Sequence, residues 1–245
     1  MSGRWKSSPL ILAVVALLVC PSMAFAKDKI RFGISGFGGY NTYKMTDLND
    51  RIDALNADSV FVANGVTLEK IKHGIGLGGG LHAWVTKDIL VSAEYERLLA
   101  KSKTDVTAGG SSGTVEFKIP ANAFMLSGAY LFPSASKARF GVGAGLGYYS
   151  GKASAEGSSG GTTLTVGEVK GHGIGFHGVG VMDYAATSEV HVGVQVGYRV
   201  AKTTELKDSA TDEVLYKDDG TTKAKADWSG LITRAGITFL FGKSE

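Results

Sequence analysis

The feature that most constrains the fold is a long alternation of apolar and polar residues around position 195. The apolar set is Val190, Val192, Val194, Val196, Tyr198 and Val200, and the set between is Glu189, His191, Gly193, Gln195, Gly197 and Arg199. A period of two places the two sets on opposite faces of one β-strand. Strands of soluble sandwiches usually have about 5 or 6 residues, whereas a membrane-crossing strand of a barrel has about 9–11. The run therefore favours a lipid-facing barrel strand.

Seven other segments follow the same pattern less cleanly. They are approximately Ile30–Tyr43, His73–Val85, Ile89–Lys101, Phe117–Phe132, Arg139–Ser150, Val169–Tyr184 and Ala226–Phe241. In the fourth segment both faces are apolar from Phe124 onward, so the pattern leaves its register open. Pro120 has no backbone donor for a ladder, and we expect a bulge or bend there.

The connections between these segments alternate between short and long. The short ones are Thr86–Asp88, Pro133–Ala138 and Ala185–Ser188, and the long polar ones are Lys44–Lys72, Ser102–Val115, Gly151–Glu168 and Ala201–Lys225. Outer-membrane barrels have short periplasmic turns and longer extracellular loops. The sequence thus predicts an all-β fold, an eight-stranded antiparallel up-and-down transmembrane β-barrel with both chain ends on the periplasmic side.

Three of the long loops carry local signals. Met45, Leu48, Ile52 and Leu55 recur at helical spacing, with Thr46 as N-cap and Asp47 favoured by the helix dipole. This predicts a short amphipathic helix over the barrel mouth. The Gly- and Ser-rich stretch 151–161 is expected to be mobile. Asp219-Gly220 is a hairpin turn signal.

The first 26 residues are typical of a cleaved export signal. Arg4 and Lys6 precede an unbroken apolar run from Leu10 to Cys20, and Ala24-Phe25-Ala26 suits cleavage before Lys27. The run is shorter than the roughly 20 residues of a membrane helix. We therefore expect a signal peptide over 1–26 and a barrel domain over 27–245.

Removing that segment changes both charge and cysteine content. The whole chain has 26 basic and 23 acidic side chains and one cysteine. The expected mature chain loses Arg4, Lys6 and Cys20, which leaves 24 basic residues against 23 acidic ones. We expect no disulfide and no thiolate metal site, and no nucleic acid as a partner.

Candidate chemistry is sparse along the chain. Gly173 to Gly178 formally matches a dinucleotide-binding pattern, but that pattern needs a helix after it, and here it lies inside one alternating strand. His177 and His191 are expected to face the lumen on neighbouring strands, where ordinary hydrogen bonding is favoured over a metal. No histidine has a serine two positions later, as lipid A deacylases of this size have. We expect no catalytic residues, no metal and no cofactor.

The inward positions predict a network of charges in the lumen. Its members are Glu94, Glu96, Arg139, Asp183, Arg199 and Arg234. Parity places all six inward, and height along the strands pairs Glu94 with Arg234, Glu96 with Arg199, and Arg139 with Asp183. An eight-stranded barrel has an interior just wide enough for side chains to fill. The pairs therefore predict a filled polar lumen.

The last segment ends in a specific motif, Arg234-Ala-Gly-Ile-Thr-Phe-Leu-Phe241. It resembles the signal on the final strand of outer-membrane barrels, which runs polar, any, Gly, any, any, aromatic, any, aromatic. The resemblance implies an assembly signal read by the barrel-assembly machinery. Its residues would be Arg234, Gly236, Phe239 and Phe241. The match departs in one respect, because four residues, 242–245, follow the final aromatic where such chains often end.

Together with the export signal and the eight segments, this motif makes the chain resemble the small eight-stranded outer-membrane proteins. These are the OmpX/Ail group, the opacity-like proteins and the OmpA transmembrane domain. Members act in adhesion, complement evasion or envelope support, so the resemblance implies a location without naming one task.

The leading functional expectation is a monomeric, non-enzymatic surface protein of the outer membrane. Its partners would be outer-membrane lipid, the barrel-assembly machinery, and an extracellular ligand or host surface contacted through the loops. One alternative is a passive channel for small apolar molecules, as in the OmpW-like barrels; the charged inward set argues against it and the Pro120 irregularity weakly for it. The third alternative is an enzyme that modifies lipid acyl chains.

Overall fold

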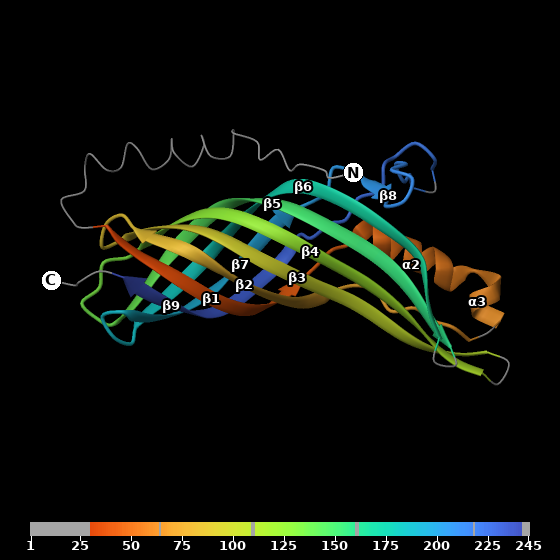
Figure 1. Ribbon diagram of the computed structural model, residues 1–245, viewed down its shortest axis with the longest axis horizontal. Helices are drawn as coiled ribbons and strands as arrows, with labels where there is room; N and C mark the ends of the chain where they lie inside the picture. Colours follow the sequence, from red (N-terminus) through yellow and green to blue (C-terminus); the bar gives the residue numbers. More distant parts are fainter. Residues whose placement is uncertain (1–29, 64, 109–110, 160–161, 218, 242–245) are drawn as a thin grey trace, which may run out of the picture.

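The computed structural model describes residues 30–63, 65–108, 111–159, 162–217 and 219–241. Eight antiparallel strands close into a ring in which the last strand pairs with the first (Figure 1). They are β1 (Arg31–Thr42), β2 (His73–Trp84), β3 (Ile89–Ala108), β4 (Ser111–Leu131), β5 (Ala138–Ser159), β6 (Thr162–Ala185), β7 (Val190–Ala201) and β9 (Gly230–Phe241). A three-residue strand outside the ring, β8 (Leu206–Asp208), pairs with β6. The predicted eight-stranded barrel is confirmed.

The alternation of each strand separates a lipid-facing surface from the lumen. On β7, Val196 and Val200 are about half exposed, whereas His191 and Arg199 are buried. The same division holds around the ring. Among the exposed apolar side chains are Phe32, Ile34, Ile75, Leu81, Phe124, Phe140, Leu146, Ile174, Phe176, Leu231 and Phe239. The closed ladder satisfies the backbone hydrogen bonds of every strand, and the apolar side chains face the lipid.

The register of β4, left open by the sequence, is fixed by its neighbours. Phe124 points outward, and Ala123 and Met125 are buried in the lumen. The expected bulge at Pro120 is wrong: Pro120 pairs with Leu99 in an unbroken ladder to β3, and the ladder to β5 resumes beyond it without a shift. The register shift lies instead between Ala155 and Glu156, opposite β6.

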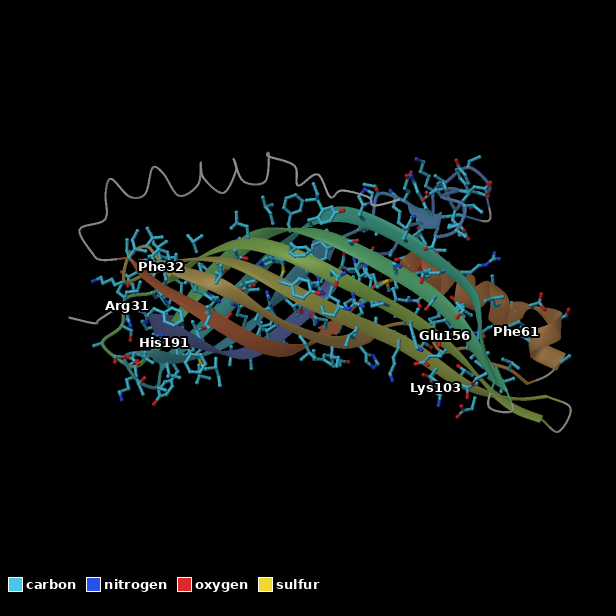
Figure 2. The ribbon with its side chains drawn as sticks, in the orientation of Figure 1. Arg31, Phe32, Phe61, Lys103, Glu156 and His191 are labelled. Carbon is cyan, nitrogen blue, oxygen red and sulfur yellow. The ribbon has the colours of Figure 1, made fainter. Side chains whose placement is uncertain are left out.

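Two of the predicted loops are strands in the structure. The described parts of these segments, 102–108, 111–115, 151–159 and 162–168, continue the β3–β4 and β5–β6 hairpins far beyond the rest of the ring, as Figure 1 shows. The backbone ladder extends them whatever their side chains are, and Lys118 of β4 binds Glu156 of β5 at 2.6 Å. Within the described residues, 151–159 are strand rather than a mobile loop. Figure 2 places Lys103 and Glu156 on this extension.

The predicted mouth helix is present. Helix α2 spans Thr46–Ala57, followed by a short helix, α3 (Ser59–Ala63). The expected N-cap is wrong by one residue: Met45 caps the helix in a left-handed conformation (φ 43°), with no side-chain cap. The Met45 side chain is fully buried, and its backbone N–H donates to the Asp227 carbonyl at 2.9 Å. Packing therefore sets the start of α2. No helix of the described residues is long and apolar enough to span a bilayer.

The helix covers an apolar cluster that closes the barrel at the loop end. We call it the mouth cluster; Met45, Ile52, Leu98, Tyr149 and Trp228 are among its buried members. Apolar side chains from the inner faces of the long hairpins, such as Phe117, pack against it. Burial of such side chains contributes about 1.5–3 kcal/mol each. The cluster thus joins α2 and the long hairpins into one packed unit.

The fourth loop contains the expected hairpin turn. Gly220 has φ +67°, which suits a glycine at a tight turn, and the Lys217 N–H donates to the Thr222 carbonyl at 2.8 Å. Hydrogen bonds from the Thr222 side chain, and from the amides of Thr222 and Thr221, lower the pKa of Asp219 to about 2. Asp219 therefore stays charged in neutral solution and stabilises the turn.

Candidate functional site

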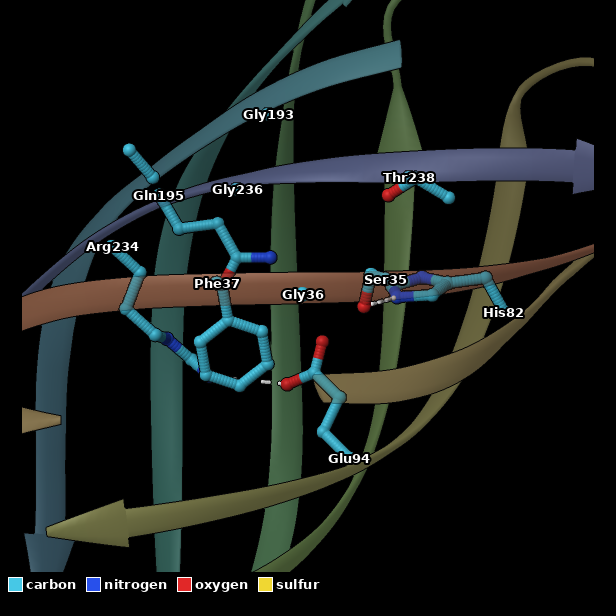
Figure 3. A pocket seen from close by; sticks show the side chains of 11 residues that line it. Ser35, Gly36, Phe37, His82, Glu94, Gly193, Gln195, Arg234, Gly236 and Thr238 are labelled. Carbon is cyan, nitrogen blue, oxygen red and sulfur yellow. Dashed lines mark hydrogen bonds and ion pairs between the residues drawn. The ribbon is translucent and has the colours of Figure 1, made fainter. Parts of the chain in front are cut away.

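The mid-lumen holds a buried ion pair between β3 and β9. An Arg234 Nη1 donates to Glu94 at 3.1 Å, and both side chains are only 4% exposed. The two residues lie on strands that are not neighbours, so the pair crosses the lumen. The Arg234 guanidinium also lies over the Phe37 ring, 5.0 Å from its centroid. In Figure 3 the three side chains converge beside a cavity of about 50 Å³.

A second ion pair lies nearer the mouth cluster. Arg199 Nη1 donates to Glu96 at 3.4 Å, and both side chains are 1% exposed. Asn41 joins them, because its amide donates to Glu96 at 3.3 Å and its carbonyl oxygen accepts from Arg199 at 3.4 Å. Arg234 lies 4.0 Å from Glu96, which links this group to the first pair. The sequence reasoning missed Asn41, although its parity with Arg31 and Ser35 places it inward.

The third pair lies at the end of the barrel where β1 begins and β9 ends. Arg139 Nη2 donates to Asp183 at 2.8 Å, and His191 Nδ1 lies 3.0 Å from the same carboxylate. The Arg139 guanidinium stacks over Trp84, 4.6 Å from the ring centroid. The structure thus brings all six charged candidates into the lumen, in the three pairs that parity and height suggested.

Two histidines bind serines rather than carboxylates. His82 Nε2 lies 2.7 Å from the Ser35 hydroxyl, and His177 Nε2 lies 3.0 Å from the Ser127 hydroxyl. A serine nucleophile needs a base that a third group orients. The second ring nitrogen of His177 is buried and has no hydrogen-bond partner in the described structure. Among the described residues, the His177–Ser127 pair therefore lacks the third member of a hydrolytic site.

Metal and nucleotide sites find no support in the part of the chain that the structure describes. No three potential ligands gather there. His177 and His191 lie on adjacent strands, but each binds a different partner, Ser127 and Asp183. The glycines from Gly173 to Gly178 lie inside β6, with no helix after them. They therefore lack the strand-to-helix turn that a dinucleotide-binding pattern needs.

The residues of the C-terminal motif occupy both faces of β9. Phe239 and Phe241 are about half exposed on the lipid-facing side, and Arg234 points into the lumen. A side chain at Gly236 would approach the Gly36 carbonyl oxygen to 2.6 Å and the Phe37 Cβ to 2.7 Å. Each position of the motif therefore has a local packing reason. The four residues that follow Phe241 lie outside the described residues.

Comparison with solved structures gives matches of low similarity. Neisserial surface protein A is 15% identical, with a TM-score of 0.43; the match covers 87% of this chain and all of that one. Ail of Yersinia pestis is 10% identical, with a TM-score of 0.40, and covers 87% and 100%. OprG of Pseudomonas aeruginosa is 13% identical, with a TM-score of 0.40, and covers 87% and 95%. No curated protein matches the sequence significantly.

The sequence itself matches one family. The profile described as "Outer membrane protein beta-barrel domain" fits residues 12–232, which is most of the chain. A closed ring with an apolar exterior and a polar interior is typical of outer-membrane barrels. The chain therefore belongs to the outer membrane protein beta-barrel domain family and is an outer-membrane protein.

Proposed function

We propose that this protein is a non-enzymatic, monomeric surface protein that contacts an extracellular ligand or a host surface through its long hairpins. The observation that carries the proposal is the extension of β3–β4 and β5–β6 beyond the ring, on the end opposite the start of β1 and the end of β9 (Figure 1). Short turns mark the periplasmic end of such barrels, so the extension faces the outside. The inner face of the extension packs on the mouth cluster. This packing holds the hairpins in one conformation, so their outer face is a preformed binding surface.

The lumen argues for this role over a channel. Three ion pairs cross or line it, and the pairs of Arg199 and Arg234 are almost fully buried. Trp228 and Tyr149 fill the mouth end with almost no exposed surface. Apolar molecules would have to pass the fully desolvated pair of Glu96 and Arg199, which is costly to separate. A filled interior leaves the outer surface as the place of interaction. Envelope support is the alternative role for the same filled barrel.

Shortening one hairpin tests the proposal directly. Residues 103–108 and 111–116 pair with each other in register, so their joint deletion keeps the ladder below them. We expect cells that carry the shortened protein to lose most of their adherence to surfaces coated with extracellular-matrix proteins. Adherence is lost because the deletion keeps the barrel in the membrane but removes the hairpin surface that contacts the ligand.

The control is a shortening in the fourth loop, removing residues 218–221 around its hairpin turn. Both variants must reach the outer membrane at the level of the unchanged protein. If the hairpin deletion leaves adherence unchanged but sensitises cells to detergent, the protein supports the envelope instead.

The lipid-facing aromatics of β9 carry a second proposal, that Arg234, Gly236, Phe239 and Phe241 form the signal read by the barrel-assembly machinery. Replacing both Phe239 and Phe241 by Ser is expected to reduce the folded protein in the outer membrane at least severalfold. Folding is read from the shift in gel mobility on boiling. The matched control replaces Phe140 and Phe176, equally lipid-facing on β5 and β6, by Ser. Equal losses in the two variants would show a requirement for lipid contact rather than a signal.

A further inference from the structure

The periplasmic end of the barrel contains a cavity that the charge pairs of the lumen do not fill. We call it the periplasmic-end cavity; it measures about 240 Å³ and is lined by Arg31, Lys87, Arg139, Trp84 and His191, among others. Figure 2 shows Arg31 and His191 together at this end, beside the start of β1. A water molecule occupies about 30 Å³ of liquid. The cavity therefore has room for an anionic group together with a substituent or its hydration.

The cations around this cavity are not matched by acids. Arg139 shares Asp183 with His191, so one carboxylate serves two basic groups. Arg31 donates only to the Ser188 carbonyl, at 2.5 Å, and its Nε is buried without a hydrogen-bond partner in the described structure. Lys87 forms no ion pair with any described residue, although its own carbonyl accepts from Arg139 at 2.6 Å. Among the described residues, Arg31 and Lys87 thus have no acidic partner at this opening.

Among the described residues, the acids of the adjoining periplasmic turns do not supply that charge. Asp88 and Glu189 belong to the same periplasmic turns, yet neither lines the cavity. Elsewhere in the lumen each arginine has a carboxylate partner, as Arg199 and Arg234 do. A concave site lined by one sign of charge concentrates the field and attracts the opposite charge. Within the described lumen, Arg199 and Arg234 show no such imbalance.

We propose that the periplasmic-end cavity binds an oxyanion, a phosphate or carboxylate group carried by a molecule of the periplasm. Arg31 would offer a guanidinium fork, which suits the geometry of both groups, and Lys87 a mobile point charge. Arg139, fixed by Asp183 and stacked on Trp84, forms the rigid wall against which the anion lies. This site is separate from the extracellular hairpins and does not depend on their role.

Titration calorimetry of the folded barrel in an uncharged detergent at low salt tests the proposal. Inorganic phosphate and acetate are the two probes. Phosphate represents a phosphate-bearing ligand, and acetate represents a carboxylate-bearing one. We expect saturable binding of at least one probe that weakens as salt is added. Arg31→Gln and Lys87→Gln should each weaken that binding about tenfold or more, because a hydrogen bond to a charged group contributes about 1.5–3 kcal/mol.

Lys137→Gln is the matched control, since Lys137 is an exposed lysine of another periplasmic turn that does not line the cavity. It should bind as the unchanged protein does. Binding of the probe should also alter the fluorescence of the unchanged protein, but not that of Trp84→Phe, which retains Trp228. The fluorescence measurement tests the site even if the variants Arg31→Gln and Lys87→Gln fail to fold. Absence of binding by both probes, or equal weakening by Lys87→Gln and Lys137→Gln, would overturn the proposal.

Discussion

Replacing Glu94 or Arg234 by alanine is expected to lower the free energy of unfolding by about 3–5 kcal/mol, because each change leaves a buried charge without its partner. Both side chains are 4% exposed, and they are 3.1 Å apart. The lumen offers little water to either group, so the loss far exceeds that of an exposed pair. Urea unfolding of the folded barrel, followed by tryptophan fluorescence, measures the difference.

The two single changes are not expected to be equal. After Glu94→Ala, Arg234 still lies 4.0 Å from Glu96, whereas after Arg234→Ala Glu94 loses the one ion partner that the described structure gives it. Arg234→Ala should therefore cost more. The double variant should recover part of the combined loss, since removing both charges leaves neither one unpaired.

An exposed pair is the control for this cycle. Lys152 and Glu168 are 2.9 Å apart, with side chains 62% and 40% exposed. Surface pairs contribute about 0–1 kcal/mol, so Lys152→Ala should change stability little. If the losses at Glu94 and Arg234 simply add in the double variant, the two side chains do not interact as a pair.

The lumen pairs could be predicted from the sequence because a barrel strand has two faces and fixed neighbours. Parity decides which residues point inward, and a slip of one residue would move every side chain to the other face. Short turns fix how far each strand is displaced from the next. These two rules place Glu94 and Arg234 at similar heights although they are far apart in the chain. No side-chain detail is needed for that result.

The region above the membrane could not be predicted in the same way. The stretch 151–159 is rich in Gly and Ser and has no clear alternation, yet it forms a strand because β4 and β6 supply backbone partners on both sides. Trp228 lies just after a polar loop, and its complete burial depends on residues from several distant segments. Such tertiary packing leaves no local period in the sequence. The start of α2 at Met45 follows from the same packing.

Two glycines of β7 are expected to differ sharply in their tolerance of a methyl group, although both pair with β6. A Cβ at Gly197 would collide with the Gly178 carbonyl oxygen and lie 2.7 Å from the Val179 Cα, both backbone atoms. A Cβ at Gly193 would have the Met182 carbonyl oxygen as its nearest neighbour, at 3.9 Å. Backbone cannot move aside as a flexible side chain does, so only the first change forces the two strands apart.

Gly197→Ala should therefore cost about 3 kcal/mol, at the upper end of overpacking, and reduce the fraction of barrel that shifts in mobility on boiling. Gly193→Ala should lie within about 0.5 kcal/mol of the unchanged protein, or gain slightly, since glycine in a strand interior costs about 0.5–1 kcal/mol relative to alanine. The two substitutions share strand, face and chemistry, so any general effect of alanine on β7 cancels between them. Similar losses at both positions would mean that the pairing of β6 with β7 differs from Val179 opposite Gly197. A large loss of stability at Gly197 alone would show that β6 and β7 can approach this closely only because position 197 has no side chain.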